Sequence, residues 1–396
     1  MHRSNNLRAL AFSLLLIIVI VVTLAAIFLF GRKGLERPET SRVLNGHENT
    51  IWAAAISADG RWLLTGSDDK TARLWNLTTA DPAASSIVLR GHTGSVFAVA
   101  FTPDGHWAIT GSGWPDNTAR LWDLTAADPS ANPISLPGHE DSISAVAVTP
   151  DGHWLVTASR DTTARLWNLK AADPAANPII LKGHEWFVSS IALSVDNHWL
   201  ATGNWDTTAR LWDLNAGDPA AYPRTFRGHQ DYVTSVALST DSHWLATGSN
   251  DKTAGLWDLN VIDPLATPQV FTGHTDHITA VAFSRDNRWL ATASLDQTAR
   301  LWDLTKADPT AEAIVLRGHE RSLNTLAFSS DGHWLVTASA DATARLWDLT
   351  APDPSKNPIV LRGHTQPIWV LAFTPEGRYL VTGGSDQTVR IWDLEE

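Results

Sequence analysis

The stretch GHEDSISAVAVTPDGHWLVTASRDTTARLWNLKAADPAANPIILK, residues 138–182, decides the fold. It contains four short apolar segments, at residues 144–148, 153–158, 163–169 and 178–181. Asp151-Gly152 and the residues around Asp161 provide turns between them, and the alternation within 163–169 is typical of a strand. Bulky side chains fall on both sides of these segments, as in a sheet that is covered on both faces. We therefore predict one four-stranded antiparallel sheet for this stretch.

The same stretch recurs eight times along the chain. Its Gly-His pair recurs every 45 residues, with one step of 47, at Gly46-His47, Gly91-His92, Gly138-His139, Gly183-His184, Gly228-His229, Gly273-His274, Gly318-His319 and Gly363-His364. A tryptophan follows each pair, at Trp75, Trp122, Trp167, Trp212, Trp257, Trp302, Trp347 and Trp392. Repeats of this length with Gly-His and Trp-Asp signatures build β-propeller blades. We predict an all-β fold, a closed propeller of eight four-stranded antiparallel blades over residues 42–396, with seven blades as the alternative.

On these motifs the chain resembles the WD-repeat (WD40) β-propeller family over residues 42–396. The resemblance implies that a histidine, a serine or threonine, an aspartate and the tryptophan of each blade form a hydrogen-bonded tetrad. In the third and sixth units its members would be His139, Ser159, Asp161, Trp167, His274, Ser294, Asp296 and Trp302. Asn204 and Gly384 replace the serine in two units, and we expect a weaker network around Gly384. Seven Asp-Pro loops, from Asp81-Pro82 to Asp353-Pro354, resemble those of bacterial members of the family.

The two ends of the repeat region predict how the ring closes. The last unit stops at Trp392-Asp-Leu-Glu-Glu396, after its third expected strand. Arg42-Val43-Leu44, ahead of the first Gly-His pair, matches Ile179-Ile180-Leu181 of the third unit in position. We expect this N-terminal strand to complete the C-terminal blade, because closure removes the free sheet edges.

Residues 9–30 (ALAFSLLLIIVIVVTLAAIFLF) form an uncharged apolar run. Twenty-two residues in a helix rise about 33 Å, which matches a hydrocarbon core of roughly 30 Å. We predict a single-pass membrane anchor, with a cleaved signal peptide and a buried soluble helix as the alternatives. A short basic tail at 1–8 precedes it, and a polar linker at 31–41 follows it. Positive charges on the two sides nearly balance, and the short basic tail favours a propeller outside the cytoplasm.

Composition and motifs argue against several classes of function. Acidic residues outnumber basic ones by 42 to 30, and this charge disfavours nucleic acid as a partner. The absence of cysteine excludes disulfides and thiolate metal sites. Thirteen of the fifteen histidines recur at equivalent places, eight in the Gly-His pairs and five before a tryptophan (His106, His153, His198, His243 and His333), so they cannot converge on one ion. We expect no metal, no cofactor and no catalytic activity, because no nucleophile elbow, P-loop or zinc-protease motif occurs.

Two positions of each unit differ between the copies, and the resemblance places both on one rim of the propeller. They are the residues after Gly-His and the residue before the tetrad aspartate. A repeat fold copies its scaffold residues, so singular residues mark a binding surface. In units three to six these positions hold Arg160, Trp186, Phe187, Trp205, Tyr232, Asn250, His277 and Leu295. We predict that these residues bind a partner, because aromatic residues and arginine dominate interface hot spots; Phe187 packing inward and Trp114 as a separate weaker site are the alternatives.

The function expected from these features is a membrane-anchored scaffold that presents a propeller to a protein or peptide partner. A second hypothesis is extracytoplasmic recognition of carbohydrate or cell wall by the same aromatic side chains, since sugars stack on tryptophan faces. An enzymatic propeller is the third, and it would need a cluster of polar residues that does not repeat.

Overall fold

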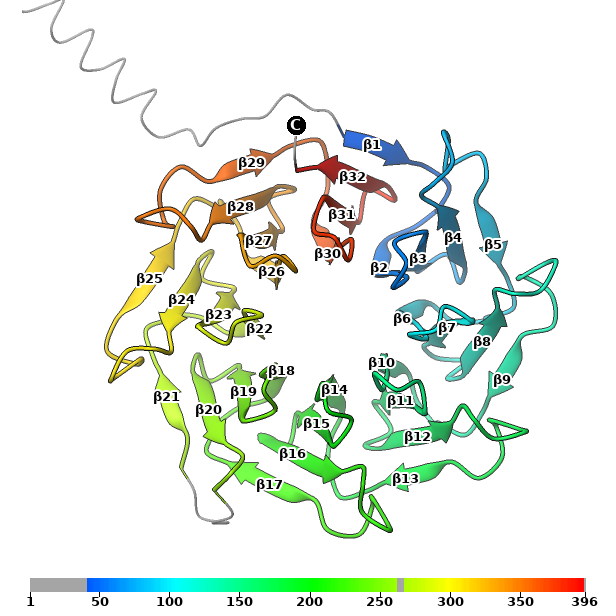
Figure 1. Cartoon of the computed structure of the whole chain (residues 1–396), viewed down its shortest axis with the longest axis horizontal. Coiled ribbons are helices and arrows are strands. Elements are labelled where there is room, and N and C mark those ends of the chain that lie inside the picture. The colour runs from blue at the N-terminus through cyan, green and yellow to red at the C-terminus, as the bar shows by residue number, and fades with distance from the viewer. Residues whose placement is uncertain (1–40, 262–266, 395–396) are drawn as a thin grey trace, which may run out of the picture.

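The computed structural model describes residues 41–261 and 267–394, which form a ring of eight sheets around a common axis (Figure 1). Each sheet has four strands, and every pairing is antiparallel. The prediction of eight four-stranded blades is therefore confirmed, and the seven-blade alternative is wrong. We number the blades 1 to 8 in chain order, so that blade 1 contains the first Gly-His pair.

The innermost strand of each blade follows the Gly-His pair and lies beside the axis (Figure 1). These strands are β2 (Ile51–Ile56), β6 (Val96–Phe101), β10 (Ile143–Val148), β14 (Val188–Leu193), β18 (Val233–Leu238), β22 (Ile278–Phe283), β26 (Leu323–Phe328) and β30 (Ile368–Phe373). The second strands are β3 (Trp62–Ser67), β7 (Trp107–Ser112), β11 (Trp154–Ser159), β15 (Trp199–Asn204), β19 (Trp244–Ser249), β23 (Trp289–Ser294), β27 (Trp334–Ser339) and β31 (Tyr379–Gly384).

The third strand of each blade carries the Trp-Asp motif, and the fourth forms the outer edge. The third strands are β4 (Ala72–Asn76), β8 (Ala119–Asp123), β12 (Ala164–Asn168), β16 (Thr208–Asp213), β20 (Ala254–Asp258), β24 (Ala299–Asp303), β28 (Ala344–Asp348) and β32 (Val389–Asp393). The outer strands are β5 (Ile87–Leu89), β9 (Ile134–Leu136), β13 (Ile179–Leu181), β17 (Arg224–Arg227), β21 (Gln269–Phe271), β25 (Ala313–Leu316), β29 (Ile359–Leu361) and, for blade 8, β1 (Ser41–Leu44).

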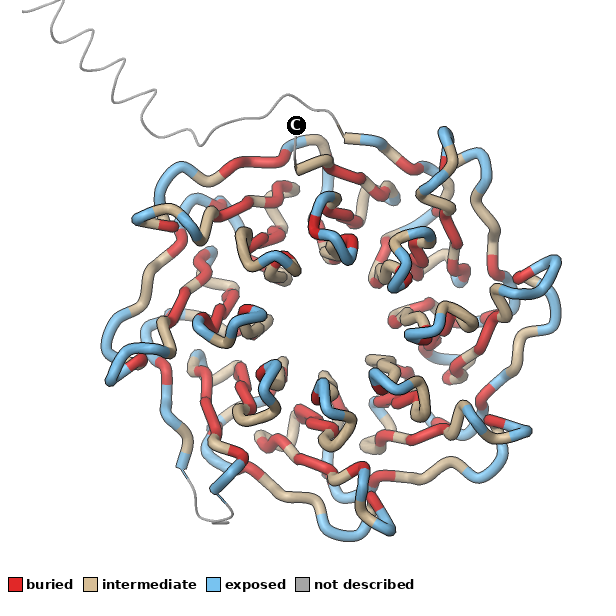
Figure 2. The backbone as a smooth tube through the Cα atoms, in the orientation of Figure 1, coloured by how far each residue is buried: buried red, intermediate tan, exposed pale blue. Residues whose placement is uncertain are grey.

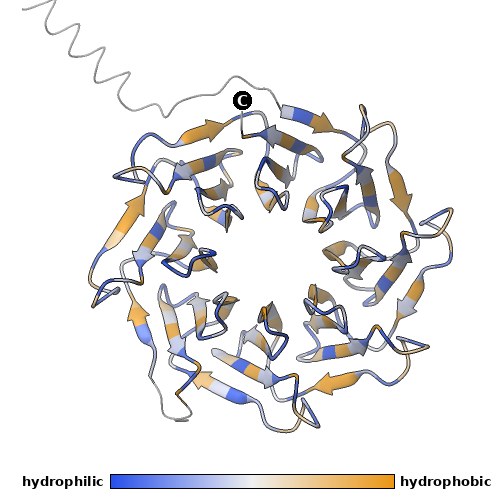
Figure 3. Cartoon of the chain, in the orientation of Figure 1, coloured by the Kyte–Doolittle hydropathy of each residue, from blue (hydrophilic) through white to orange (hydrophobic). Residues whose placement is uncertain are grey.

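The hydrophobic core is divided into layers between neighbouring blades. One such layer joins Ile109 and Leu121 of blade 2 to Ile143, Leu155 and Trp167 of blade 3. The second strands are the most buried, and exposed residues concentrate in the loops (Figure 2). Apolar and polar residues alternate along many strands (Figure 3). Each blade therefore buries both of its faces against neighbours, as the bulky residues on both sides of the strands predicted.

The ring closes through β1, as the two ends of the repeat region predicted. Strand β1 pairs with β32 of blade 8, with Ser41 opposite Trp392 and Leu44 opposite Val389. Leu44 is 1% exposed, and Arg390 Nη1 donates a hydrogen bond of 2.9 Å to Ser41 Oγ. Strand β1 begins at Ser41, the last residue of the predicted linker.

Every innermost strand has a register shift at its second residue, which is characteristic of a β-bulge. In blades 3 to 7 the side chain at this bulge position hydrogen-bonds the first strand of the next blade. Ser144 Oγ, for example, donates to Val188 O at 2.5 Å, and Ser189 Oγ donates to Val233 O at 2.7 Å. Equivalent bonds come from Thr234, Thr279 and Asn324.

Blades 8, 1 and 2 carry aromatic residues at the bulge position. The rings of Trp369 and Trp52 lie 5.1 Å apart, and those of Trp52 and Phe97 lie 6.2 Å apart between centroids. We call Trp369, Trp52 and Phe97 the seam cluster, because it follows the point where β1 closes the ring. The repeat pattern alone did not predict this cluster, although the five other units have Ser, Thr or Asn at this position, so that the three aromatic residues are exceptional among the units.

Within residues 41–261 and 267–394 no helix is long and apolar enough to span a membrane. The predicted anchor at 9–30 and the predicted tail at 1–8 lie outside the described residues.

Candidate functional site

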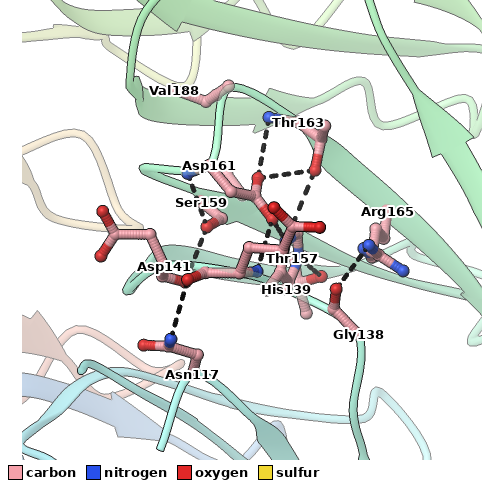
Figure 4. Close-up of polar contacts among 12 residues, drawn as sticks. Asn117, Gly138, His139, Asp141, Thr157, Ser159, Asp161, Thr163, Arg165 and Val188 are labelled. Atoms are coloured by element: carbon pink, nitrogen blue, oxygen red, sulfur yellow. Dashed lines mark hydrogen bonds and ion pairs between the residues drawn. The ribbon is translucent and has the colours of Figure 1, made fainter. Parts of the chain in front are cut away.

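Each blade contains a chain of hydrogen bonds that joins its tryptophan to its aspartate. Figure 4 shows the histidine, threonine and aspartate of this chain in blade 3. In blade 3, Trp167 Nε1 donates to Thr157 Oγ1 at 2.9 Å. Thr157 Oγ1 lies 2.8 Å from His139 Nε2, and His139 Nδ1 lies 2.7 Å from Asp161 Oδ2. Since the carboxylate can only accept, we assign the histidine proton to Nδ1, and Thr157 then donates to Nε2.

The hydroxyl that connects histidine to tryptophan differs from the expected one. It belongs to Thr157 in blade 3 and Thr292 in blade 6, so Ser159 and Ser294, which the family resemblance implied, were wrong. Ser159 lies two residues further along the same face of β11, further from Trp167 than Thr157 is. Its Oγ donates to Asp141 O at 2.9 Å and accepts from the Asp161 backbone N–H at 3.0 Å. The serine therefore holds the turn that carries the aspartate.

This correction changes what the two exceptional units mean. In blade 8, His364 and Trp392 still meet Thr382 Oγ1, at 2.7 and 2.9 Å, although Gly384 replaces the serine. The tetrad of blade 8 is therefore complete, and Gly384 lacks only the bonds that a serine makes within the turn. In blade 4, the Asn204 amide takes over both serine roles by donating to Trp186 O and accepting from the Asp206 N–H.

The electrostatics of the tetrads keep the aspartates charged, and burial lowers the pKa of three of the histidines, His92, His184 and His319. Burial raises the pKa of Asp161, but the hydrogen bond and charge of His139 and the bonds from Thr163 and the Glu140 N–H lower it well below its ordinary value. Burial lowers the pKa of His184, and the opposing effect of Asp206 is smaller. Thr157 is fully buried, so a substrate cannot reach this Asp-His-hydroxyl arrangement. The tetrad is a structural element, as its eightfold repetition indicates.

The five histidines that precede a tryptophan are also structural. Each ring stacks on its tryptophan at 4.1 to 4.7 Å between centroids. Four of them approach an aspartate of the third strand at 3.0 to 3.3 Å: His106, His198, His243 and His333. In the part of the chain that the structure describes, no three His, Cys, Asp or Glu side chains are grouped so as to hold a metal ion.

The two variable positions of each unit lie side by side on one rim. In seven blades the residue before the tetrad aspartate donates its backbone N–H to the carbonyl of the third residue after the Gly-His histidine, and in blade 2, where this residue is Pro115, Gly113 donates to Ser95 O instead. This bond is 3.1 Å from Trp205 to Phe187 and 2.9 Å from Asn250 to Tyr232. Blade 3 joins Arg160 to Ser142 and blade 6 joins Leu295 to His277 in the same way. The hydrogen bond aligns both side chains of a blade beside the end of its innermost strand.

Aromatic side chains form a continuous row across blades 4 and 5. Trp186 meets Phe187 edge to face at 6.2 Å, and Phe187 meets Trp205 at 5.1 Å. Trp205 then stacks on Tyr232 of the next blade, with centroids 4.7 Å apart and planes 6° from parallel. The Arg160 guanidinium of blade 3 lies 6.0 Å from the Phe187 ring centroid. We call Arg160, Trp186, Phe187, Trp205 and Tyr232 the rim patch.

The rim patch combines a packed base with exposed faces. Trp186 is 54% exposed and Tyr232 is 36% exposed, whereas Phe187 and Trp205 are half-buried between their neighbours. Phe187 therefore supports the two tryptophans and does not turn into the blade. Of the other predicted residues, Asn250 adjoins the patch through its bond to Tyr232, and His277 and Leu295 occupy the corresponding place on blade 6.

Trp114, the weaker candidate, is 74% exposed in the lengthened turn of blade 2. Its backbone N–H donates to Ser142 Oγ of blade 3 at 3.0 Å. The aromatic contacts of the rim patch do not include it, so it is a separate feature of the same rim.

Comparison with known proteins places these features in a family. The family model described as WD domain, G-beta repeat matches residues 38–76, 84–123, 132–168, 177–213, 221–258, 265–303, 312–348 and 355–393. Among solved structures, the chain is similar to Chaetomium thermophilum Sqt1, in a crystal structure of that protein bound to the N-terminus of the ribosomal protein L10. The two are 20% identical with a TM-score of 0.74, and the match covers 89% of this chain and 98% of that one. At this identity the likeness shows the fold alone.

Proposed function

The chain belongs to the WD-repeat family, and from this premise we propose that it is a non-enzymatic scaffold that binds a protein or peptide partner on the rim patch. The buried hydroxyls of the tetrads leave no accessible nucleophile there. A protein of the same fold is described bound to a segment of another protein. Both observations support a binding role.

The observation that carries the proposal is the row of rings from Trp186 to Tyr232. Phe187 and Trp205 hold their neighbours in fixed orientations, so little side-chain entropy remains to be lost when a partner binds. Trp186 offers a large apolar face, and Arg160 offers a charge beside it. Tryptophan, tyrosine and arginine in such clusters contribute most of the affinity of protein interfaces.

A peptide-display selection with the full-length chain tests this proposal. Trp186→Ala combined with Trp205→Ala should weaken binding of the selected peptides at least tenfold, since each hot spot contributes more than about 1 kcal/mol. Trp114→Ala is the matched control, because it removes an exposed tryptophan of the same rim outside the patch. Equal affinity of the double variant and the native chain would refute the proposal that the rim patch binds the partner. Selective binding of glycans in a parallel array, with no peptide selected, would favour the carbohydrate hypothesis.

Membrane anchoring through residues 9–30 is part of the proposal. Its support is the uncharged run of 22 residues and the short distance to the ring, since β1 begins at Ser41. The ten residues 31–40 reach at most roughly 35 Å, so the propeller would lie close to the bilayer with its seam nearest the anchor. The Asp-Pro loops are the support for a bacterial source. Protease treatment of intact cells and inverted vesicles tests the orientation, and cleavage of the propeller in inverted vesicles would contradict an extracytoplasmic propeller.

A further inference from the structure

Blade 5 departs from the repeat at a position that is constant in the seven other blades. In each of those seven blades, the second residue of the Ala-Arg-Leu-Trp or related motif on the third strand is an arginine. These arginines are Arg73, Arg120, Arg165, Arg210, Arg300, Arg345 and Arg390. Blade 5 has Gly255 there, on β20. Blade 5 therefore lacks a side chain that the seven other blades share.

The repeated arginine occupies a defined site beside the Gly-His pair. In six blades its Nη2 donates to the carbonyl of the Gly-His glycine at 2.6 to 2.8 Å, as Arg165 does to Gly138 (Figure 4). In blade 2, Arg120 Nη2 lies 3.9 Å from the tetrad carboxylate of Asp116. Burial lowers the pKa of Arg345, and the negative charge of Asp341 opposes that effect. The guanidinium thus supplies both a hydrogen bond and a counter-charge.

Blade 5 has a cavity of about 240 Å³ where this side chain would lie. A water molecule takes up about 30 Å³ in the liquid, so the cavity is large enough for a side-chain head group. Gly228 and Asp251 line it together with Gly255, Pro268 and Val270. The Asp251 side chain is 11% exposed, more than its counterparts at 2–9%, and Val270 is 45% exposed.

The charge around this cavity also differs from that in the other blades. The residue before the next Gly-His pair is basic in blades 1, 3, 4, 6 and 7, and several of these side chains interact electrostatically with the repeated arginine. Blade 5 has Thr272 at this place, so it is the one blade without a basic residue at either position. Gln230 Nε2 donates to Gly228 O at 3.1 Å, which satisfies that carbonyl but adds no charge. The cavity therefore lies beside a carboxylate without the usual cation.

We infer that this cavity binds an arginine side chain supplied by a protein partner. The guanidinium would donate to Gly228 O and neutralise Asp251, as the intrinsic arginine does in the other blades. The methylene stem would lie against Pro268 and Val270, because arginine combines an apolar stem with a charged, planar head. The inference stands on blade 5 alone and does not depend on the rim patch.

The cavity and the rim patch are connected by one loop. Gln230 lines the cavity and Tyr232 belongs to the rim patch, so their Cα atoms are at most roughly 7 Å apart. A partner that contacts the aromatic row can therefore place a neighbouring arginine in the cavity.

Ligand-observed NMR titration of the full-length chain with N-acetyl-arginine amide tests the inference. Saturable binding is expected, at least tenfold tighter than that of N-acetyl-citrulline amide, which has the same shape without the charge, and than that of N-acetyl-lysine amide. Gly255→Arg should abolish this binding by filling the cavity. A Cβ at position 255 would lie 2.8 Å from Thr247 Oγ1, but the equivalent Thr292 faces Arg300 in blade 6, so the site can adjust.

Gly217→Arg is the matched control, because a Cβ there meets no atom within 4 Å, and it should bind like the native chain. Arg300→Gly combined with Arg317→Thr provides a second arm if Gly255→Arg fails to fold, since it copies both exceptional positions of blade 5 and should raise the capacity from one site to two. Equal binding of the arginine and citrulline probes, native-like binding by folded Gly255→Arg, or an unchanged capacity in the double variant of blade 6 would overturn the inference. Tighter binding of free L-arginine than of the capped form would overturn its assignment to a protein partner.

Discussion

Blades 3 to 7 and blades 8, 1 and 2 are fastened to their neighbours by different forces at the same backbone position. In blades 3 to 7, a hydroxyl or amide at the bulge position bonds the carbonyl of the next blade, as Ser189 bonds Val233. In blades 8, 1 and 2, the rings of the seam cluster pack against one another instead. We call these two parts of the ring the polar arc and the seam arc.

This difference between the arcs accompanies a difference in how the blades are completed. Along the polar arc, each blade follows its neighbour in the chain and completes its own four strands. At the seam, blade 8 is completed only by the non-covalent pairing of β1 with β32. A hydrogen bond contributes about 1 kcal/mol, whereas burial of a large aromatic side chain contributes more. The seam cluster thus adds the larger contribution at the innermost strand of blade 8, the one blade of the described ring that is completed by a strand from the other end of the chain.

Acid is expected to have the largest effect, because it acts on all eight tetrads in both arcs. The pKa of each tetrad aspartate is lowered in the folded state, to about 2 for Asp386, so stability present above about pH 4 is lost as the pH falls further. Burial also lowers the pKa of His92, His184 and His319, so the loss begins below about pH 6.5. The unfolding temperature, followed by circular dichroism, should decrease as the pH is lowered through each of these two pH ranges. A constant value down to about pH 4 would contradict the lowered pKa of these three histidines.

Leu44→Ala should have the next largest effect. Leu44 and its counterpart Leu181 in blade 3 are each 1% exposed, and removing a buried leucine costs about 2–5 kcal/mol. Leu44→Ala should cost more than Leu181→Ala, because it also loosens the pairing of β1 with β32. Denaturant unfolding measures the cost, and hydrogen exchange should show early loss of protection at Val389 and Ile391. Equal costs and equal exchange patterns would mean that the seam is no weaker than the other junctions.

Trp52→Ala and Ser189→Ala compare the two arcs at the bulge position itself. Loss of the half-buried Trp52 ring should cost about 3 kcal/mol, and loss of the Ser189 bond about 1 kcal/mol. Trp52→Phe is the control for ring packing. Trp52 Nε1 is buried without a hydrogen-bond partner in the described part of the chain, so phenylalanine should cost less than about 1 kcal/mol. A cost of Trp52→Ala no larger than that of Ser189→Ala would refute the role given to the seam cluster.

Gly384→Ser restores the residue found in most units, yet it should destabilise the protein by about 1–2 kcal/mol through overpacking. A Cβ at position 384 would press against the backbone carbonyl of Pro367, a residue that no other unit has at that place. Thermal unfolding of two variants measures the effect: Gly384→Ser introduces the serine in blade 8, and Ser159→Gly removes it from blade 3. A stabilising Gly384→Ser would show that the loop of blade 8 can adopt the form seen in the polar arc.

Trp186→Ala should have the smallest effect on folding, within about 0.5 kcal/mol, because the side chain is 54% exposed. Trp205→Ala should cost more, about 1 kcal/mol, since it removes the stack on Tyr232. Both values come from denaturant unfolding. A cost of several kcal/mol for Trp186→Ala would assign it to the support of the polar arc and would weaken its role as a contact for a partner.

The sequence was sufficient for features that repeat and for features that follow from chain order. Eight Gly-His and Trp motifs predicted eight blades, and the missing last strand predicted the pairing of Arg42-Val43-Leu44 with the C-terminal blade. It was insufficient for the tetrad hydroxyl, because Thr157 and Ser159 point to the same face of β11 and differ only in depth. Spacing along a strand does not specify which of two such residues reaches a side chain on another loop.

The sequence by itself determined the architecture and the location of the singular residues, because periodicity and composition are local properties of the chain. The tertiary structure decided which singular residues act together. It stacked Trp205 on Tyr232 across 27 positions of sequence, and it joined Trp52 to Trp369 across the closure. It also showed that Gly255 leaves a cavity beside Asp251. Contacts between blades depend on the twist and packing of whole sheets, which the spacing of residues within one repeat does not contain.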